Sequence, residues 1–292
     1  GVPNVQRVYG DVLKPKTLTP LLRGADVVFH LAAKVNIEDR HDTHMDRVNV
    51  RGTLNVLRAC KKLQTGRLVH CSSVHSLRHG PEVHEYQPLV KRGDAEGYDL
   101  TKARGEAQVL RAVRRQGLDA VVVNPTGMIG PHDYHGSALG KFFRGQWKYM
   151  PAVNGAYDMV DVRDACRGML LAAQRGRTGE RYILGGHWVR VPDLMMRAQE
   201  ASGERAWFVV PWLGWPVTLP WTLASWSVPL VRAAYQWMGW EPVLSRPALA
   251  VLQSTQAISH HKAALELGYD VRPLAQTIRD IFAWQREHHL HR

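Results

Sequence analysis

The sequence is poor in cysteine and opens without a secretory signal. Its three cysteines, Cys60, Cys71 and Cys166, form no C-x-x-C pair, which excludes a disulfide scaffold and a zinc site built on thiolates. No charged segment followed by an apolar run begins the chain, so a signal peptide is not predicted. These absences are typical of a reducing compartment, and we predict a cytoplasmic location.

Blocks of positive charge are also absent, although the overall charge is unbalanced. Lys and Arg number 38 against 26 Asp and Glu, which gives a net charge of +12. Such an excess can attract nucleic acid, an anionic membrane or phosphate groups. Because the arginines are dispersed and no nucleic-acid-binding motif is present, we predict no nucleic-acid partner and interpret the charge as a solvated surface.

Short apolar runs alternate with amphipathic stretches through the first two-thirds of the chain. With 45% hydrophobic and 22% charged residues, the chain can bury a sizeable core. Strands are predicted at 25–31, 67–71, 118–124 and 180–184, and helices at 48–63, 98–116, 161–174 and 273–292. This alternation is typical of an α/β fold with a parallel sheet covered by helices on both faces.

The last third of the chain contains a long uncharged segment. Residues 206–231 carry no charge, and 207–240 hold seven of the ten tryptophans. The length would suit a transmembrane helix, but prolines at four positions argue against one continuous helix: Pro211, Pro216, Pro220 and Pro229. Besides a true span, two interpretations stay open. The segment forms the apolar wall of a substrate lobe, or it contacts a membrane surface, where tryptophan is favoured.

Three side chains are candidates for catalysis. Tyr98 and Lys102 are four residues apart, so they lie on one face of the predicted helix. An ammonium beside a phenol favours the phenolate, so we expect Lys102 to lower the pKa of Tyr98 and make it a general acid/base. Ser73 follows the strand at 67–71, and open α/β sheets place ligands at the carboxyl ends of their strands. From these residues alone, a turn-forming serine pair with a surface tyrosine remains an alternative.

Eight further short segments follow one another in a characteristic order. They are Y-G-D-V at 9–12, V-F-H-L-A-A at 28–33, V-N-V-R-G-T-L-N-V at 48–56, V-H-C-S-S at 69–73, Y-D-L-T-K at 98–102, N-P-T-G-M-I-G-P at 124–131, M-V-D-V-R-D at 159–164 and H-K-A-A-L-E-L-G-Y at 261–269. In this order the chain resembles the extended short-chain dehydrogenases/reductases of the NAD-dependent epimerase/dehydratase superfamily. The likeness is greatest to the branch of 3β-hydroxysteroid dehydrogenases and dihydroflavonol 4-reductases.

The resemblance implies roles for individual residues. Tyr98 would be the acid/base, Lys102 would tune it and bond the nicotinamide ribose, and Ser73 would anchor the substrate oxygen. The implied cofactor-binding residues are Asp11, Val12, Leu31, Ala32, Ala33, Asn49, Ser72, Tyr98, Lys102, Pro125, Thr126 and Gly127. Within this set, 11–12 would meet the adenine, 31–33 would lie along the cofactor, and 125–127 would cover the nicotinamide. Asn49 would support the ends of the catalytic strands.

Metal chemistry is not part of this expectation. The histidines at 260–261 and in the tail at 288–291 have no carboxylate or thiolate partner at ligand spacing, so no metal site is predicted. His132 and Asp133 follow the segment at 124–131, where they either line the pocket or cap a loop. Asp161 and Asp164 are interpreted as charges at a helix N-terminus.

The resemblance fails at the start of the chain. The family opens with a strand, a GxxGxxG turn and a helix whose N-terminus binds the pyrophosphate, and no such turn occurs here. We therefore expect an N-terminally truncated, Rossmann-like, doubly wound sheet that lacks its first β-α-β unit. The truncated dinucleotide-binding domain is predicted at 1–130. A smaller substrate lobe is predicted at 131–292, with 156–185 returning to the first domain.

The predicted function is that of an NAD(P)-dependent oxidoreductase that interconverts a secondary alcohol and a ketone. The uncharged segment favours an apolar, steroid-, isoprenoid- or flavonoid-like substrate. Because the missing turn carries the residue that separates NAD from NADP, both cofactors stay open. The alternatives are a sugar-nucleotide epimerase and a cofactor-less fragment that serves as a binding module. Dehydratases carry an acidic pair after the catalytic hydroxyl, whereas Val74 and His75 follow here. The resemblance also implies a homodimer.

Overall fold

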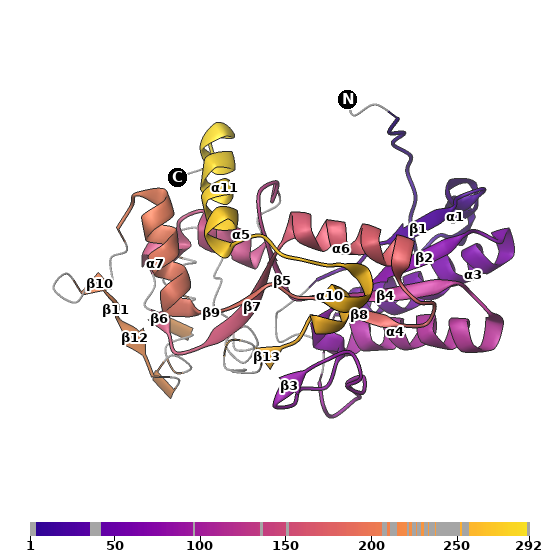
Figure 1. Ribbon diagram of the computed structural model, residues 1–292, viewed down its shortest axis with the longest axis horizontal. Coiled ribbons are helices and arrows are strands. Elements are labelled where there is room, and N and C mark those ends of the chain that lie inside the picture. Colours follow the sequence, from indigo (N-terminus) through magenta and orange to yellow (C-terminus); the bar gives the residue numbers. More distant parts are fainter. Residues whose placement is uncertain are drawn as a thin grey trace.

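A parallel four-stranded sheet forms one end of the elongated molecule (Figure 1). The computed structural model describes residues 4–35, 42–95, 97–134, 137–149, 152–205, 209–210, 215–220 and 257–290, and isolated positions between 222 and 252. The strands are β1 (Val27–His30), β2 (Arg67–Cys71), β4 (Ala120–Pro125) and β8 (Arg181–Leu184), in the order β1-β2-β4-β8. All three pairings are parallel.

Helices cover both faces of this sheet because successive strand residues point to opposite sides. One face packs on α1 (Pro15–Leu22), α3 (Thr53–Leu63) and α4 (Gly97–Gln116), with Leu68 and Val122 in that cluster. The other face packs on α6 (Val162–Arg175) and α10 (His261–Leu267), with Val121 and Val123 in that cluster. The predicted α/β class, with a doubly wound parallel sheet, is therefore confirmed.

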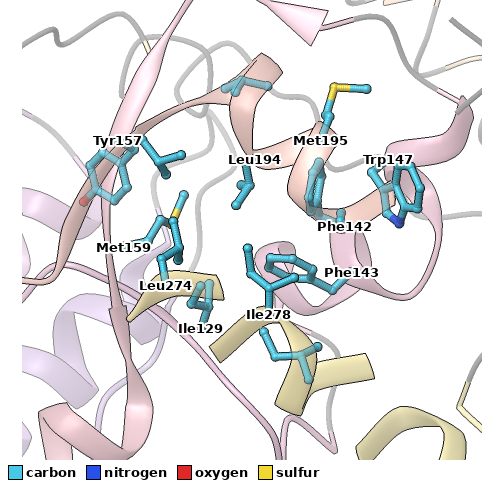
Figure 2. Packing of buried hydrophobic residues seen from close by; sticks show 14 of the residues in the cluster. Ile129, Phe142, Phe143, Trp147, Tyr157, Met159, Leu194, Met195, Leu274 and Ile278 are labelled. Atoms are coloured by element: carbon cyan, nitrogen blue, oxygen red, sulfur yellow. The ribbon is translucent and has the colours of Figure 1, made fainter. Parts of the chain in front are cut away.

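A smaller mixed sheet occupies the other half of the molecule. It contains β5 (Gly127–Ile129), β7 (Ala156–Asp161) and β9 (His187–Arg190), with β5 and β7 parallel and β7 and β9 antiparallel. Three helices pack on it: α5 (Ala138–Phe143), α7 (Val191–Ser202) and α11 (Leu274–Glu287). Their apolar side chains meet in one cluster, shown in Figure 2.

Short elements complete the described structure. The helix α2 (Thr43–Asp46) leads into a π-helical turn at Arg47–Gly52, and 3-10 turns lie at Val74–Ser76 and Gln146–Tyr149. Three two-stranded pairs are formed, in order, by β3 (Glu82–Val83) with β13 (Ala257–Ile258), β6 (Ala152–Val153) with β12 (Thr218–Leu219), and β10 (Val209–Val210) with β11 (Trp215–Pro216).

The predicted elements at 25–31, 67–71, 98–116 and 161–174 match β1, β2, α4 and α6 to within two or three residues. The predicted helix at 48–63 is correct in type, but its first turn is π-helical. Most of 206–240 lies outside the described residues, and none of the described helices is long and apolar enough to cross a membrane. The boundary at residue 130 between a dinucleotide-binding domain and a substrate lobe remains a prediction.

Two buried histidines lie near the carboxyl ends of β1 and β2. The rings of His30 on β1 and His70 on β2 are 5.3 Å apart, and His30 Nε2 is hydrogen-bonded to Thr53 Oγ1 at 3.0 Å. Burial, followed by the positive charge of Lys102, lowers the pKa of His30 from 6.5 to about 4. Burial also lowers the pKa of His70 well below 6.5. Both imidazoles are therefore neutral near pH 7.

We expect the chain to lose stability in mild acid. A histidine whose pKa is lowered by folding stabilises the fold above pH 6.5, and this contribution is lost as the pH falls from there toward about 4. The expected slope is about 1.4 kcal/mol per pH unit for each such histidine. Urea unfolding between pH 7.5 and 4.5 measures it. His70→Phe should reduce the slope, whereas His261→Gln at an exposed position should not. An unchanged slope in His70→Phe would contradict this account.

Candidate active site

The Ser73 and Tyr98 hydroxyls meet at the carboxyl end of the main sheet. Ser73 lies two residues beyond β2 in an extended conformation, and its Oγ accepts the His75 backbone N–H at 3.2 Å. Tyr98 is the second residue of α4, whose first residue is Gly97 at a φ of +57°, where a side chain would be strained. The Ser73 hydroxyl lies near enough to the Tyr98 hydroxyl to act on its pKa. The turn after β2 and the start of α4 thus face each other.

Lys102 lies one helical turn after Tyr98 and is almost fully buried. Its Nζ donates a hydrogen bond of 2.6 Å to the Cys71 carbonyl at the end of β2. The structure therefore brings Ser73, Tyr98 and Lys102 together around one strand end. Burial lowers the pKa of Lys102, whereas the nearby Cys71 and Glu106 raise it.

The expected pKa of Tyr98 is wrong in its direction. Burial raises the pKa of this phenol above its ordinary value of 10, and the neighbouring Cys71 and Asp99 raise it further. The Ser73 hydroxyl acts in the opposite direction but is outweighed. The physical reason is that an anionic phenolate loses its hydration in this site, while the Lys102 ammonium is directed to a carbonyl. The phenol is accordingly protonated at neutral pH.

A fully buried carboxylate holds the turn that carries Ser73. Glu106 on α4 accepts the Ser76 hydroxyl at 2.6 Å and the Asn124 side-chain amide at 2.9 Å. The same amide nitrogen donates to the Ser73 carbonyl at 3.1 Å. The guanidinium of Arg181 lies 3.6 Å from the other carboxylate oxygen and balances its charge. This network connects α4, β4, β8 and the turn after β2.

Asn49 joins the end of β1 to the catalytic helix. Its Oδ1 accepts the Lys34 backbone N–H at 2.8 Å, and its Nδ2 donates to the Lys34 carbonyl at 2.9 Å. The same nitrogen donates to Thr101 Oγ1 at 3.0 Å, and Thr101 donates to the Tyr98 carbonyl. These contacts suit the supporting role that the resemblance implies, which the sequence alone could not distinguish from cofactor contact.

Several of the implied cofactor residues lie along the same edge of the sheet. Leu31, Ala32 and Ala33 are exposed directly after β1. The hydroxyls of Ser72 and Thr126, after β2 and β4, are buried without a hydrogen-bond partner. A bound polar ligand would satisfy such groups. An exposed backbone beside two such hydroxyls and a lysine therefore fits a nucleotide cofactor.

The remaining implied cofactor residues lie before α1 and where β4 is followed by β5. Asp11 accepts the Leu13 backbone N–H at 2.8 Å, and the Asn55 side chain donates to the Val12 carbonyl at 2.9 Å. Pro125 ends β4, and Gly127 begins β5 directly after Thr126.

Sequence patterns did not identify His75 as a residue of the site. Its Nε2 lies 2.7 Å from the Tyr157 hydroxyl, and its Nδ1 lies 3.9 Å from the Asp99 carboxylate. Burial lowers the pKa of His75 to about 4, so the imidazole is neutral, and burial raises the pKa of Asp99 to about 6. The feature of the sequence that could have pointed to His75 is its position two residues after Ser73. Its partner Tyr157 is distant in sequence.

Other candidate residues have structural contacts. Asp133 accepts the backbone N–H and the hydroxyl of Ser137, so the loop-capping interpretation applies to it, and His132 packs against Trp284. Asp161 caps α6, as predicted. Asp164 in the first turn of α6 binds the Arg272 guanidinium. In the described part of the chain, no three His, Cys, Asp or Glu side chains are grouped as metal ligands.

This arrangement is that of a Rossmann-type α/β protein with a hydroxyl- and ammonium-bearing site at the sheet edge. The model of the NAD dependent epimerase/dehydratase family matches residues 2–185, and the chain belongs to that family. Sterol demethylase protein B of Methylococcus capsulatus is 29% identical, over 97% of this chain and 85% of that protein. A putative dihydroflavonol 4-reductase of Synechocystis is 33% identical, over 96% of this chain and 82% of that protein.

A solved structure shows the same fold. The crystal structure of gox2253 superimposes with a TM-score of 0.78 at 30% identity, covering 97% of this chain and 85% of that one. The predicted family membership is confirmed by these comparisons. Because the family is NAD dependent, an enzyme with a nicotinamide cofactor is the class to which this chain belongs.

Loss of the buried carboxylate should destabilise the fold. We expect Glu106→Ala to lower the free energy of unfolding by about 3 kcal/mol, because Ser76 and Asn124 lose an acceptor and Arg181 loses its counter-charge. The exposed Glu200 on α7 provides the matched control, and Glu200→Ala should change stability by less than about 0.5 kcal/mol. Urea titration at pH 7.5 compares the two variants. Equal effects would show that the network does not stabilise the turn.

Proposed function

We propose that the protein is an NAD(P)-dependent oxidoreductase that interconverts a secondary alcohol and a ketone on an apolar substrate. The observation that carries the proposal is the contact between Ser73 and Tyr98, with Lys102 beside the same strand end. Two hydroxyls on adjacent elements can bind one substrate oxygen together. This is the requirement for proton transfer to or from that oxygen.

The chemistry divides between the side chains and the cofactor. When bound, the nicotinamide exchanges a hydride with the carbinol carbon of the substrate. Ser73 orients the substrate oxygen by a hydrogen bond, and Tyr98 donates a proton to it during reduction or accepts one during oxidation. Because burial raises the pKa of Tyr98, the resting phenol carries the proton that ketone reduction consumes.

The cofactor would bind along the edge that contains residues 31–33. Lys102 would bond the ribose, and the segment 125–127 would cover the nicotinamide. The exposed backbone after β1 and the unpartnered Ser72 and Thr126 hydroxyls support this placement. NAD and NADP both remain candidates, and titration with NADH and NADPH distinguishes them.

The substrate class follows from the relatives and from the uncharged segment. A sterol demethylase component and a putative dihydroflavonol 4-reductase both match over most of their length, and their names indicate fused-ring substrates. Residues 206–231 carry no charge, which suits an apolar ligand. We therefore favour a steroid-, isoprenoid- or flavonoid-like alcohol over a sugar nucleotide.

The tryptophan-rich segment supports a second part of the proposal, contact with a membrane surface. Among its described residues, Leu223, Trp226, Leu230 and Trp237 are 57%, 84%, 76% and 89% exposed. All four are large apolar side chains within a segment of 15 residues. Tryptophan favours the lipid interface, and a net charge of +12 favours anionic lipid. Homodimer formation stays a prediction.

Removal of the Tyr98 hydroxyl tests the catalytic role. We expect Tyr98→Phe to reduce kcat for a secondary alcohol about 100- to 10,000-fold while the affinity for NADH or NADPH is retained. Steady-state kinetics and nucleotide fluorescence titration measure the two quantities. Tyr86→Phe, at a tyrosine that is 72% exposed, is the control. Unchanged kcat in Tyr98→Phe removes the proton-transfer role. Turnover of a nucleotide sugar by the wild type would favour the epimerase, and no nucleotide binding would favour the binding module.

Vesicle sedimentation tests the membrane contact. We expect the wild type to pellet with vesicles of phosphatidylserine and phosphatidylcholine at low salt, because exposed indoles insert at the interface. The double variant Trp226→Ser, Trp237→Ser should bind about fivefold less. Trp188→Ser, at a position 47% exposed on β9, is the control for a general loss of surface tryptophan. A wild type that stays in the supernatant contradicts the prediction.

A further inference from the structure

His75 and Tyr157 form a hydrogen-bonded pair beside the catalytic hydroxyls. His75 belongs to the 3-10 turn that Ser73 caps, and Tyr157 belongs to β7 of the smaller sheet. Their rings are stacked with centroids 5.7 Å apart and planes inclined by 14°, and the hydroxyl lies 2.7 Å from Nε2. The pair thus joins the catalytic turn to the second half of the molecule.

The direction of this hydrogen bond follows from Asp99. The Asp99 carboxylate is 3.9 Å from Nδ1 of His75, which otherwise has no hydrogen-bond partner. A nearby carboxylate favours the tautomer that carries its proton on Nδ1. In that tautomer Nε2 is an acceptor, so the Tyr157 hydroxyl donates to it. The orientation of the Tyr157 ring is therefore held by a buried neutral imidazole.

The Tyr157 ring also lies against the segment implied in covering the nicotinamide. A Cβ added at Gly127 would lie 2.7 Å from Tyr157 Cε1, so only a glycine admits the ring at this distance. Tyr157 is buried and belongs to the apolar cluster that includes Met159 and Leu194. Figure 2 shows Tyr157 at the margin of this cluster with its hydroxyl directed away from the other labelled side chains.

Tyr157 consequently stands at the junction of three features: the catalytic turn, the segment at 125–127 and the apolar core of the smaller half. Tyr98 and Asp99 lie near enough to act on it electrostatically.

We propose that Tyr157 is a specificity-determining residue whose ring forms the substrate-side wall of the site, and that His75 is the positioning residue that holds it there. The ligand class is an apolar alcohol with fused rings, which extends far enough to contact the Tyr157 ring. A small alcohol that reaches only Ser73 and Tyr98 does not use this wall. The inference rests on the proposed function for its substrate class.

The test compares a fused-ring ligand with a small one. Dehydroepiandrosterone is the steroid probe and cyclohexanol is the small alcohol. Steroid affinity is measured from ligand-dependent thermal stabilisation, which needs no turnover, and KM is measured for each alcohol. The variants are Tyr157→Phe, His75→Phe, the double variant and the conservative His75→Gln, whose amide oxygen can accept the Tyr157 hydroxyl. Tyr86→Phe is the control at an exposed tyrosine.

The expected result is a loss of about tenfold in steroid affinity in Tyr157→Phe and in His75→Phe, with an unchanged KM for cyclohexanol. The double variant should lose no more than either single variant, because both changes remove one hydrogen bond. His75→Gln should restore most of the affinity. Additive losses, an equal loss for cyclohexanol, or no stabilisation of the wild type by the steroid would each overturn the proposal.

Failure of the proposed function has a different signature. The wild type could bind the steroid and the variants could show the expected losses of steroid affinity while neither alcohol is turned over. That result would disprove the oxidoreductase function and would still support the role of Tyr157 in binding the steroid. Thermal unfolding without ligand identifies any variant that fails to fold. His75→Gln and Tyr157→Phe then provide two independent tests, since each preserves most of the original side-chain volume.

Discussion

The site depends on one buried carboxylate. Glu106 has no exposed surface, and it accepts hydrogen bonds from Ser76 and Asn124 while Arg181 balances its charge. Since Asn124 also binds the Ser73 carbonyl, the carboxylate determines where the turn after β2 lies relative to α4. A buried carboxylate is costly unless all its partners are present. Through Glu106, the position of α4 relative to β4 and β8 is therefore linked to the placement of Ser73.

A second constraint is the low polarity around the reacting groups. Burial raises the pKa of Tyr98 and lowers those of Lys102 and His75, so it opposes the charged form of each side chain. Val74 and His75 follow Ser73, so no acidic pair stands directly after this hydroxyl.

The two halves of the molecule meet beside the candidate active site. Ser73 follows β2, and Tyr98 and Lys102 lie on α4 at the edge of the main sheet, whereas Tyr157 belongs to a different sheet and to the apolar cluster of the smaller half. His75 is the contact between them. Variation in β7 or in the adjoining cluster could therefore alter the wall without moving the catalytic hydroxyls.

Local patterns were sufficient to predict most of the strands and helices of the main sheet. Alternating apolar runs predicted the strands, and the spacing of Tyr98 and Lys102 predicted a shared helical face, because both depend on residues close together in the chain. The pKa of Tyr98 and the pairing of His75 with Tyr157 were decided only by the tertiary structure. Burial and contacts across 82 residues arise from packing, which no local period encodes.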